Sequence, residues 1–308
     1  MNLFTEQINN WDDWGNIFQS VPAFTPLVEH ILAKEKLPSA KIENLTPGTN
    51  AVFKVGDYVI KIFAPTESGI DQSLDLQTEL FATSRANKLG ISAPKLITHG
   101  FIEDKYRWAY MITEYIHGME LGEAVKTMTN CEKTDIARKL RVITDKMNTS
   151  CEPFNGIDVI NDKVRYRRWD IFPECFKAER LAYIKARDYG EKVFVHGDLC
   201  LDNILLTSQG ELYIIDFADA ALAPKIYEHA HMAYVLGYDT DFDPALLRGY
   251  FEDYTADEFM EMCFNGLLIH DFGGSIVTDC IGKADEFQGL ADLREKLRIQ
   301  MKEAIIWI

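Results

Sequence analysis

The stretch HGDLCLDNILL, residues 196–206, constrains the fold of this chain more than any other feature. It places a histidine, two aspartates and an asparagine within eight positions and then runs directly into Ile-Leu-Leu. The apolar end predicts a buried strand, and the polar start predicts a loop that leads into it. Loops with this many carboxylate and carboxamide groups commonly carry a function. A second short strand, LYIIDF, follows after an SQG turn and contains Asp216.

Short strands dominate the first part of the chain. Residues 11–36 have the apolar spacing of a helix, and AKIENL, AVFKVG and DYVIKIF then alternate like strands between turn sequences. Residues 73–90 predict an amphipathic helix that Gly90 ends, and APKLITHGFI and RWAYMITEYI predict two more strands. We therefore expect a five-stranded antiparallel sheet with one internal helix, ending near Tyr115.

Helical patterns dominate the second part of the chain, where only the two strands described above interrupt them. The predicted helices cover residues 134–147, 225–238, 244–254, 256–277 and 291–308. The chain is thus predicted to be an α+β protein with two lobes. Residues 1–115 form the smaller lobe, to which residues 1–40 add extra helices, and residues 116–308 form the larger, mainly helical lobe.

Length and charge exclude several classes of protein. A chain of 308 residues is long enough for two lobes with cores of their own. The net charge of −16 argues against nucleic acid as a partner, because a phosphate backbone requires a basic surface. No apolar run reaches the roughly 18 residues of a membrane span, and the first residues lack the features of a signal peptide. We expect a cytoplasmic protein with six reduced cysteines and no zinc site, because no C-x-x-C pair or Cys/His cluster occurs.

The spacing of three polar residues points to phosphoryl transfer. Asn203 lies five residues after Asp198, and Asp216 lies eighteen residues after it. Phosphoryl transfer from ATP requires a carboxylate that accepts the proton of the attacking hydroxyl, and oxygen ligands that hold Mg²⁺ against the phosphates. The protein-kinase motif H-R-D-L-x-x-x-N has the same Asp-to-Asn spacing. In the first lobe, Lys61 lies on a predicted strand, and Glu79 lies eighteen residues later on the predicted helix, where it can pair with Lys61.

These motifs resemble the aminoglycoside phosphotransferase and choline kinase-like family, whose members are small-molecule kinases with a bilobal protein-kinase-like fold. The resemblance rests on HGDLCLDNILL and IIDFADA and covers the chain from about Lys41 to at least Tyr238. Gly197 in place of arginine, IDFAD in place of D-F-G, and the missing A-P-E segment distinguish this chain from protein kinases.

The resemblance implies roles for individual residues. Asp198 would be the catalytic base, Asn203 and Asp216 would bind Mg²⁺, and Lys61, held by Glu79, would bind the phosphates of ATP or GTP. The remaining nucleotide contacts would come from a phosphate loop and from the segment between the lobes, namely Thr49, Asn50, Thr113, Tyr115 and Ile116. His196 is expected to brace the loop. Glu228 stands where the family often has an aspartate. This departure from the family pattern puts the local packing and the acceptor pocket in question.

The acceptor is the least constrained part of the hypothesis. Residues 211–290 contain 16 acidic and three basic residues, and such a field attracts cations. Together with the resemblance, this favours a cationic small molecule of the aminoglycoside type and a role in antibiotic resistance. The candidate acceptor contacts are Asp239, Asp241, Asp243, Asp271 and Glu228.

Alternatives remain open at this point. They are a choline or ethanolamine kinase, a homoserine kinase, a sugar kinase acting on methylthioribose or fructosamine, and a non-catalytic nucleotide-binding scaffold. The sequence does not choose between ATP and GTP, or between a monomer and a small homo-oligomer.

Overall fold

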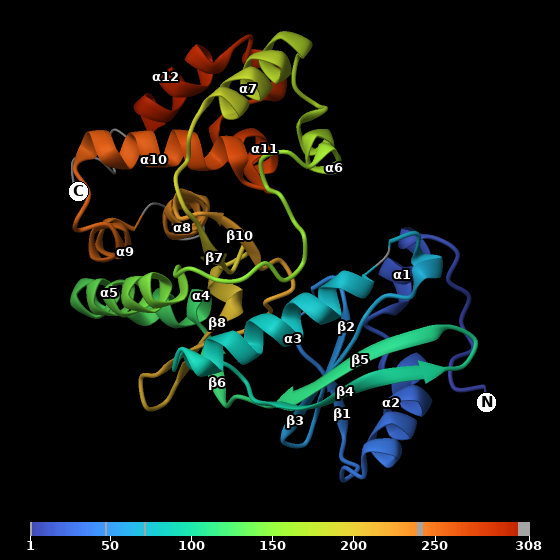
Figure 1. Ribbon diagram of the computed structural model, residues 1–308. Coiled ribbons are helices and arrows are strands. Elements are labelled where there is room, and N and C mark those ends of the chain that lie inside the picture. The colour runs from blue at the N-terminus through green and yellow to red at the C-terminus, as the bar shows by residue number, and fades with distance from the viewer. Residues whose placement is uncertain (1, 47, 71, 239–242, 301–308) are drawn as a thin grey trace. The chain divides into compact units, whose positions relative to one another are not determined.

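The structure, a computed structural model, describes residues 2–46, 48–70, 72–238 and 243–300. The chain divides into two compact units, Met1–His117 and Gly118–Ile308, and the division lies two residues beyond the expected position (Figure 1).

The first unit is built on one five-stranded sheet, and this part of the fold prediction is confirmed. The strand order is β1-β2-β3-β5-β4, and all neighbouring strands are antiparallel. The strands are β1 (Ile42–Asn44), β2 (Ala51–Val55), β3 (Tyr58–Ile62), β4 (Leu96–Glu103) and β5 (Arg107–Glu114). The helices are α1 (Trp11–Ile17), α2 (Val21–Glu35), η1 (Thr66–Ser68) and α3 (Ser73–Lys88).

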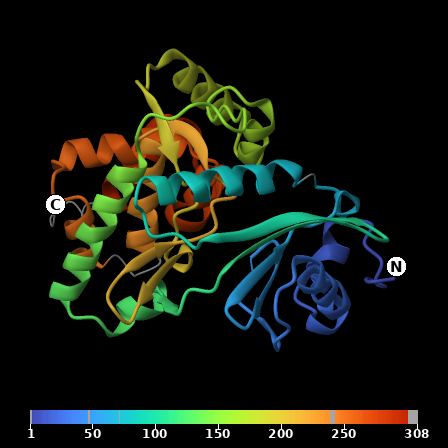
Figure 2. The same cartoon turned by 60° about the horizontal axis from the view of Figure 1, so that its bottom comes forward.

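Alternation along β3 and β5 gives the sheet two buried faces. One face carries Ile60 and Ile112, which belong to the same core as residues of α1 and α2. The other face carries Phe63 and Met111, which pack with Leu76 of α3. Figure 2 shows α3 lying along the strands β4 and β5. Because Lys61 lies between Ile60 and Ile62 on β3, its side chain points to the face that α3 covers.

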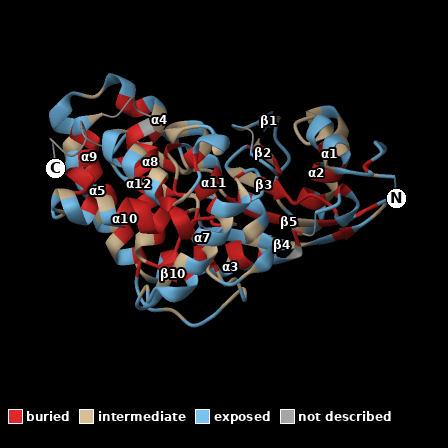
Figure 3. Ribbon diagram, turned by 90° about the horizontal axis from the view of Figure 1, so that it is seen from above, coloured by how far each residue is buried: buried red, intermediate tan, exposed pale blue. Residues whose placement is uncertain are grey.

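The second unit is mainly helical, as predicted. Its helices of four or more residues are α4 (Leu121–Ala124), α5 (Asn130–Met147), α6 (Lys163–Tyr166), α7 (Glu174–Ala186), α8 (Ile226–Tyr238), α9 (Pro244–Tyr250), α10 (Ala256–Ile269), α11 (Gly273–Ile276), the π-helix η5 (Val277–Ile281) and α12 (Leu290–Gln300). Its 3₁₀ turns are η2 (Val125–Thr127), η3 (Arg167–Trp169), η4 (Leu201–Asn203) and η6 (Ala284–Glu286). The helices α8 and α10 pack against each other, and buried residues run through both (Figure 3).

Two small antiparallel sheets complete the second unit. One pairs β6 (Gly118–Glu120), β8 (Ile204–Thr207) and β9 (Leu212–Ile214), and the other pairs β7 (Lys192–Val195) with β10 (Ala221–Pro224). The predicted strands of residues 203–207 and 212–217 are confirmed as β8 and β9, although β9 ends at Ile214. The strands β6, β7 and β10, each of three or four residues, were not predicted.

Some predicted helices differ from the observed ones. Residues 11–36 form two helices, because Ser20 caps α2 with its side chain and a proline stands in the first turn of that helix. Residues 256–277 form α10 and α11, which are separated at His270, where the backbone is extended. The helix α7 was not predicted because Arg180 interrupts its apolar face. The Arg180 guanidinium donates to the carbonyl oxygen of Leu268 and lies 4.1 Å from the Trp169 ring.

Within the described residues, no helix has the length and apolar character needed to cross a membrane.

Candidate active site

The loop after β7 carries the candidate catalytic residue and begins with a glycine in a conformation that other residues rarely adopt. Gly197 has φ of +87°, and a Cβ at this position would lie 2.2 Å from the carbonyl oxygen of Asp219. Both the left-handed backbone and the close approach therefore require glycine. This packing explains physically why glycine, and no larger residue, stands before Asp198.

Two buried side chains brace this loop. His196, which is fully buried, bonds through Nε2 to the carbonyl oxygen of Ile215 at 3.0 Å, and its ring lies against Phe217. The backbone N–H of His196 donates to Oε2 of Glu228 on α8 at 2.5 Å. The bracing role expected for His196 is thus present in the structure.

Glu228 has a role that differs from the expected one. Its side chain is fully buried and accepts from the backbone of the loop, so the structure gives no support to the expected contact with an acceptor. Burial raises the pKa of Glu228 to about 7, although the backbone N–H groups of His196 and Gly197 favour its ionised form. Glu228 on α8 therefore fixes the start of this loop.

Asp198 and Asn203 are held together by the loop itself. The amide nitrogen of Asn203 donates to the backbone carbonyl oxygen of Asp198 at 2.9 Å and lies 3.4 Å from its carboxylate. This contact turns the amide oxygen of Asn203 away from Asp198, as a cation ligand requires. The backbone of Asn203 accepts from Ile215 at 3.0 Å, which places Asp216 beside it. The spacing read from the sequence thus brings these three side chains to one place.

The electrostatics of this place favour a bound cation. Burial, and then the negative charges of Asp219 and Asp216, raise the pKa of Asp198 to about 7. Asp216 also has φ of +58°, an uncommon conformation for a residue other than glycine and one that clusters at functional sites. Carboxylate and amide oxygens suit Mg²⁺, which keeps several ligands from substrate and water. The residues present therefore fit a Mg²⁺ site formed by Asn203 and Asp216.

A stacked histidine pair lies next to Asp198, and the sequence analysis did not identify it. Nε2 of His231 on α8 is 3.9 Å from a carboxylate oxygen of Asp198, and the His231 ring stacks on His270 with centroids 4.7 Å apart. Burial lowers the pKa of His231 to about 3, so this ring is neutral. The available sequence signal was the pattern E-H-A-H on a predicted helix. This pattern does not indicate which of the two histidines faces Asp198.

The first unit contains the predicted pair of Lys61 and Glu79. The Lys61 ammonium lies 2.7 Å from the Glu79 carboxylate, and less than a tenth of either side chain is exposed. The cross-strand neighbours Val52 and Met111 fix the position of Lys61 in the sheet. Because both charges are buried and paired, the lysine is held in one extended orientation.

The loop between β1 and β2 is tied to the N-terminal helices. The indole N–H of Trp14 donates to the carbonyl oxygen of Thr49 at 2.8 Å, while the Thr49 side chain is exposed. Asn50 is buried, and its side-chain oxygen accepts from the backbone of Ala64, so the Asn50 side chain serves the fold. Of the two residues predicted for phosphate contacts, only Thr49 presents its side chain at the surface.

The segment that follows β5 has one backbone donor already engaged. The N–H of Tyr115 donates to the carbonyl oxygen of Asp57 at 2.8 Å, which removes it as a contact for adenine in this conformation. Thr113 lies in β5 opposite Val59. Of the two alternatives for the second adenine contact, Ile116 is therefore favoured over Tyr115.

The carboxylates predicted to bind a cationic acceptor are largely engaged elsewhere. Asp239 and Asp241 lie outside the described residues. Asp243 caps α9 with its side chain, and its carboxylate lies 2.5 Å from the Lys133 ammonium. Asp243 therefore stabilises the contact between α5 and α9, and the expectation that it binds the acceptor is not supported.

Asp271 is also paired. Its carboxylate is 93% buried and lies 2.5 Å from Arg165 and 3.1 Å from Arg168. Its backbone N–H donates to the hydroxyl of Tyr227. A carboxylate that already has two guanidinium partners does not attract an ammonium group.

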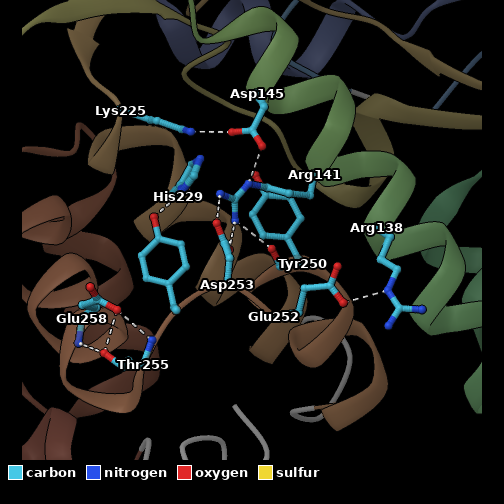
Figure 4. A network of polar contacts seen from close by, with 11 residues as sticks. Arg138, Arg141, Asp145, Lys225, His229, Tyr250, Glu252, Asp253, Thr255 and Glu258 are labelled. Carbon is cyan, nitrogen blue, oxygen red and sulfur yellow. Dashed lines mark hydrogen bonds and ion pairs between the residues drawn. The ribbon is translucent and has the colours of Figure 1, made fainter.

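Ion pairs compensate further acidic residues of this region. Figure 4 shows Arg141 of α5 between Asp145 and Asp253, and Arg138 beside Glu252. The two guanidinium contacts with Asp253 are 2.8 and 2.9 Å long. The excess of acidic residues counted along the sequence therefore overstates the field that a ligand would meet.

Comparisons with known proteins identify a family and similar folds. The model of a phosphotransferase enzyme family, APH, matches residues 43–263. The GDP and kanamycin complex of an APH(2") enzyme is 15% identical and has a TM-score of 0.55, with 91% of this chain and 96% of that chain covered. Choline kinase LicA from Streptococcus pneumoniae is 15% identical and has a TM-score of 0.56, with 90% and 99% covered.

A choline/ethanolamine kinase family protein from Mesorhizobium loti is 17% identical and has a TM-score of 0.55, with 91% of this chain and 98% of that chain covered. No curated protein sequence matches this chain. At these identities the solved structures establish a protein-kinase-like fold, and they include both aminoglycoside and choline kinases.

Proposed function

Because this chain belongs to the APH phosphotransferase enzyme family, we propose that it transfers the γ-phosphoryl group of ATP or GTP to a hydroxyl of a small molecule. The observation that carries the proposal is the cluster of Asp198, Asn203 and Asp216. These residues supply the proton acceptor and the two oxygen ligands that phosphoryl transfer requires.

Asp198 is the catalytic base in this proposal. With its pKa raised to about 7, it can accept the proton of the attacking hydroxyl near neutral pH. Asn203 donates to Asp198 and so orients the catalytic carboxylate. Asn203 and Asp216 hold Mg²⁺, which neutralises negative charge on the phosphates when it is bound.

The first unit binds the nucleotide. The ammonium of Lys61, oriented by Glu79, pairs with the phosphates, and the backbone around Thr49 covers them. Backbone groups of Thr113 and Ile116 contact the base. Related structures hold GDP, so GTP is tested beside ATP.

The acceptor class remains a separate question. An aminoglycoside-type cationic acceptor, which the sequence favoured, has the kanamycin complex of a similar protein as its support. Choline and ethanolamine acceptors are supported by the similarity to choline kinases. Homoserine and sugar acceptors are supported by the resemblance to the family alone. None of the predicted acceptor carboxylates within the described residues is available for an ammonium group, since Asp243 and Asp271 are paired and Glu228 is buried.

Two variants and one control test the proposed chemistry. Asp216→Asn should weaken Mg²⁺-dependent binding of ATP or GTP in calorimetry, because it removes the charged metal ligand. Asp198→Asn should retain nucleotide binding and lower the rate of ADP release with an acceptor by about 10²–10⁴-fold. Asp202→Asn, an exposed neighbour in the same loop, should change neither.

The non-catalytic scaffold predicts a different result. A scaffold would bind nucleotide but release no ADP with any hydroxyl compound, and Asp198→Asn would then have no phenotype. Failure of the wild-type protein to bind either nucleotide would refute the proposed function itself.

A further inference from the structure

A row of aromatic rings connects Asp198 with a basic segment, which we define as residues 163–168, KVRYRR. His231 lies 3.9 Å from the Asp198 carboxylate, and its ring centroid is 6.0 Å from that of Phe272. The guanidinium carbon of Arg168 is 5.7 Å from the Phe272 ring. The row leads from the Asp198 carboxylate past the buried His231 ring to Phe272, which is partly exposed, and to the exposed Arg168.

The two arginines nearest the rings are not neutralised by their shared partner. Asp271 lies 2.5 Å from Arg165 and 3.1 Å from Arg168, so one buried carboxylate faces two guanidinium groups. Asp162 caps α6 and is 3.9 Å from Arg165, so Arg165 faces two carboxylates and Arg168 faces one. Half of the Arg168 side chain remains exposed. The basic segment as a whole contains four cationic side chains, Lys163, Arg165, Arg167 and Arg168, against the two carboxylates of Asp162 and Asp271. The segment therefore presents net positive charge at the surface of an otherwise acidic protein.

The backbone of the basic segment is held close to α11. A Cβ at Gly274 would lie 2.6 Å from the carbonyl oxygen of Arg168, and a Cβ at Gly273 would lie 3.0 Å from the Trp169 ring. Only glycine permits these approaches. Arg168 is thus presented from a closely packed support, and Asp271 holds its guanidinium in place, which is the preorganisation that a binding site requires.

We propose that Arg165 and Arg168 bind an anionic group, a carboxylate or a phosphate, of the acceptor whose hydroxyl is phosphorylated at Asp198. This inference rests on the proposed function and specifies its substrate class. Planar guanidinium groups match the two oxygens of such anions and repel ammonium groups. The partly exposed ring of Phe272 suits the uncharged part of the acceptor that lies between its hydroxyl and its anionic group.

The first test uses acceptors in matched pairs. Pantothenate and panthenol, or glycerate and glycerol, differ in one carboxylate, and kanamycin and choline represent cationic acceptors. We expect kcat/KM from ADP release to be at least about tenfold higher for the anionic member of a pair, as for a charge-assisted bidentate contact. Higher kcat/KM with kanamycin or choline than with every anionic acceptor would overturn the inference.

The second test requires no acceptor to be known. Phenylglyoxal modifies exposed arginines, and mass spectrometry then follows Arg168 and its exposed neighbour Arg167 separately. Inorganic phosphate and malonate, which represent the phosphate and carboxylate classes, should slow the modification of Arg168 at least threefold and leave Arg167 unchanged. Equal rates of Arg168 modification with and without both anions would overturn the inference, even if no acceptor in the first test were phosphorylated.

Variants separate this site from the nucleotide site. Anions should also slow the modification of Arg165 in the wild-type protein. Arg168→Gln should abolish this protection and raise KM for an anionic acceptor, while Arg167→Gln should do neither. The dissociation constant of Mg²⁺-ATP should be unchanged in both variants. If Arg168→Gln instead weakened ATP binding, the arginines would serve the nucleotide and the inference would be wrong. Loss of ATP binding in the wild-type protein would refute only the proposed function.

Discussion

The buried carboxylate of Glu228 leads to a quantitative prediction about stability. Its pKa is raised from the ordinary value of 4.5 to about 7, chiefly by burial. Between these two pH values the folded protein holds a proton that the unfolded chain has released, so the stability of the folded state falls as the pH rises. The difference corresponds to about 3 kcal/mol, because one pKa unit is worth about 1.4 kcal/mol.

Glu228→Gln removes this ionisation and keeps an oxygen that accepts from the loop. At pH 5 the wild-type carboxyl is protonated and resembles the amide, so the two proteins should have similar stability. At pH 8 the wild-type protein must bury a charge, and the variant should have gained about 3 kcal/mol relative to it. Asp198 titrates in the same range, and its negative charge contributes to the raised pKa of Glu228. The comparison is therefore made in an Asp198→Asn background, in which only Glu228 differs between the two proteins.

Hydrogen–deuterium exchange in increasing urea measures the relevant free energy of unfolding. Peptides from β7 and α8 report on the second unit alone, which avoids assuming that both units unfold together. A difference between Glu228→Gln and wild type that is the same at pH 5 and pH 8 would refute the reasoning. If the variant instead lost stability relative to wild type as the pH rose, the N–H groups of the loop would lower the pKa of Glu228 by more than burial raises it.

Three further predictions concern single residues. Trp14→Phe should weaken Mg²⁺-ATP binding about fivefold in calorimetry, because it removes a hydrogen bond to Thr49 that is worth about 1 kcal/mol. The matched control is Trp108→Phe, because the buried indole N–H of Trp108 has no hydrogen-bond partner within the described residues. This control should leave ATP binding unchanged. Gly197→Ala should destabilise the protein by about 2 kcal/mol or more, and a melting temperature equal to that of wild type would contradict the packing described for the catalytic loop. Cys200, whose pKa is raised to about 12 by burial, should react with iodoacetamide at pH 8 far more slowly than the exposed cysteines in peptide mapping, whereas equal labelling would show an exposed thiol.

The sequence by itself determined the parts of this protein that depend on local spacing. Asp198 and Asn203 lie in one short loop, and two short strands bring Asp216 to them, so their grouping follows from chain order. Lys61 and Glu79 lie on a strand and a helix whose periods were visible, and the ion pair follows from the faces that those periods define.

Only the tertiary structure decided which charges face which partners. Asp243 and Asp271 appear in the sequence as members of an acidic run, but they pair with basic residues about one hundred positions away. Glu228 was a candidate acceptor contact in the sequence, yet α8 packs so that it is fully buried. Electrostatic energy depends on distance in space and on burial, and sequence position alone specifies neither. For this reason the grouping of the candidate catalytic residues was predictable from the sequence, whereas the charges available to an acceptor depended on the tertiary structure.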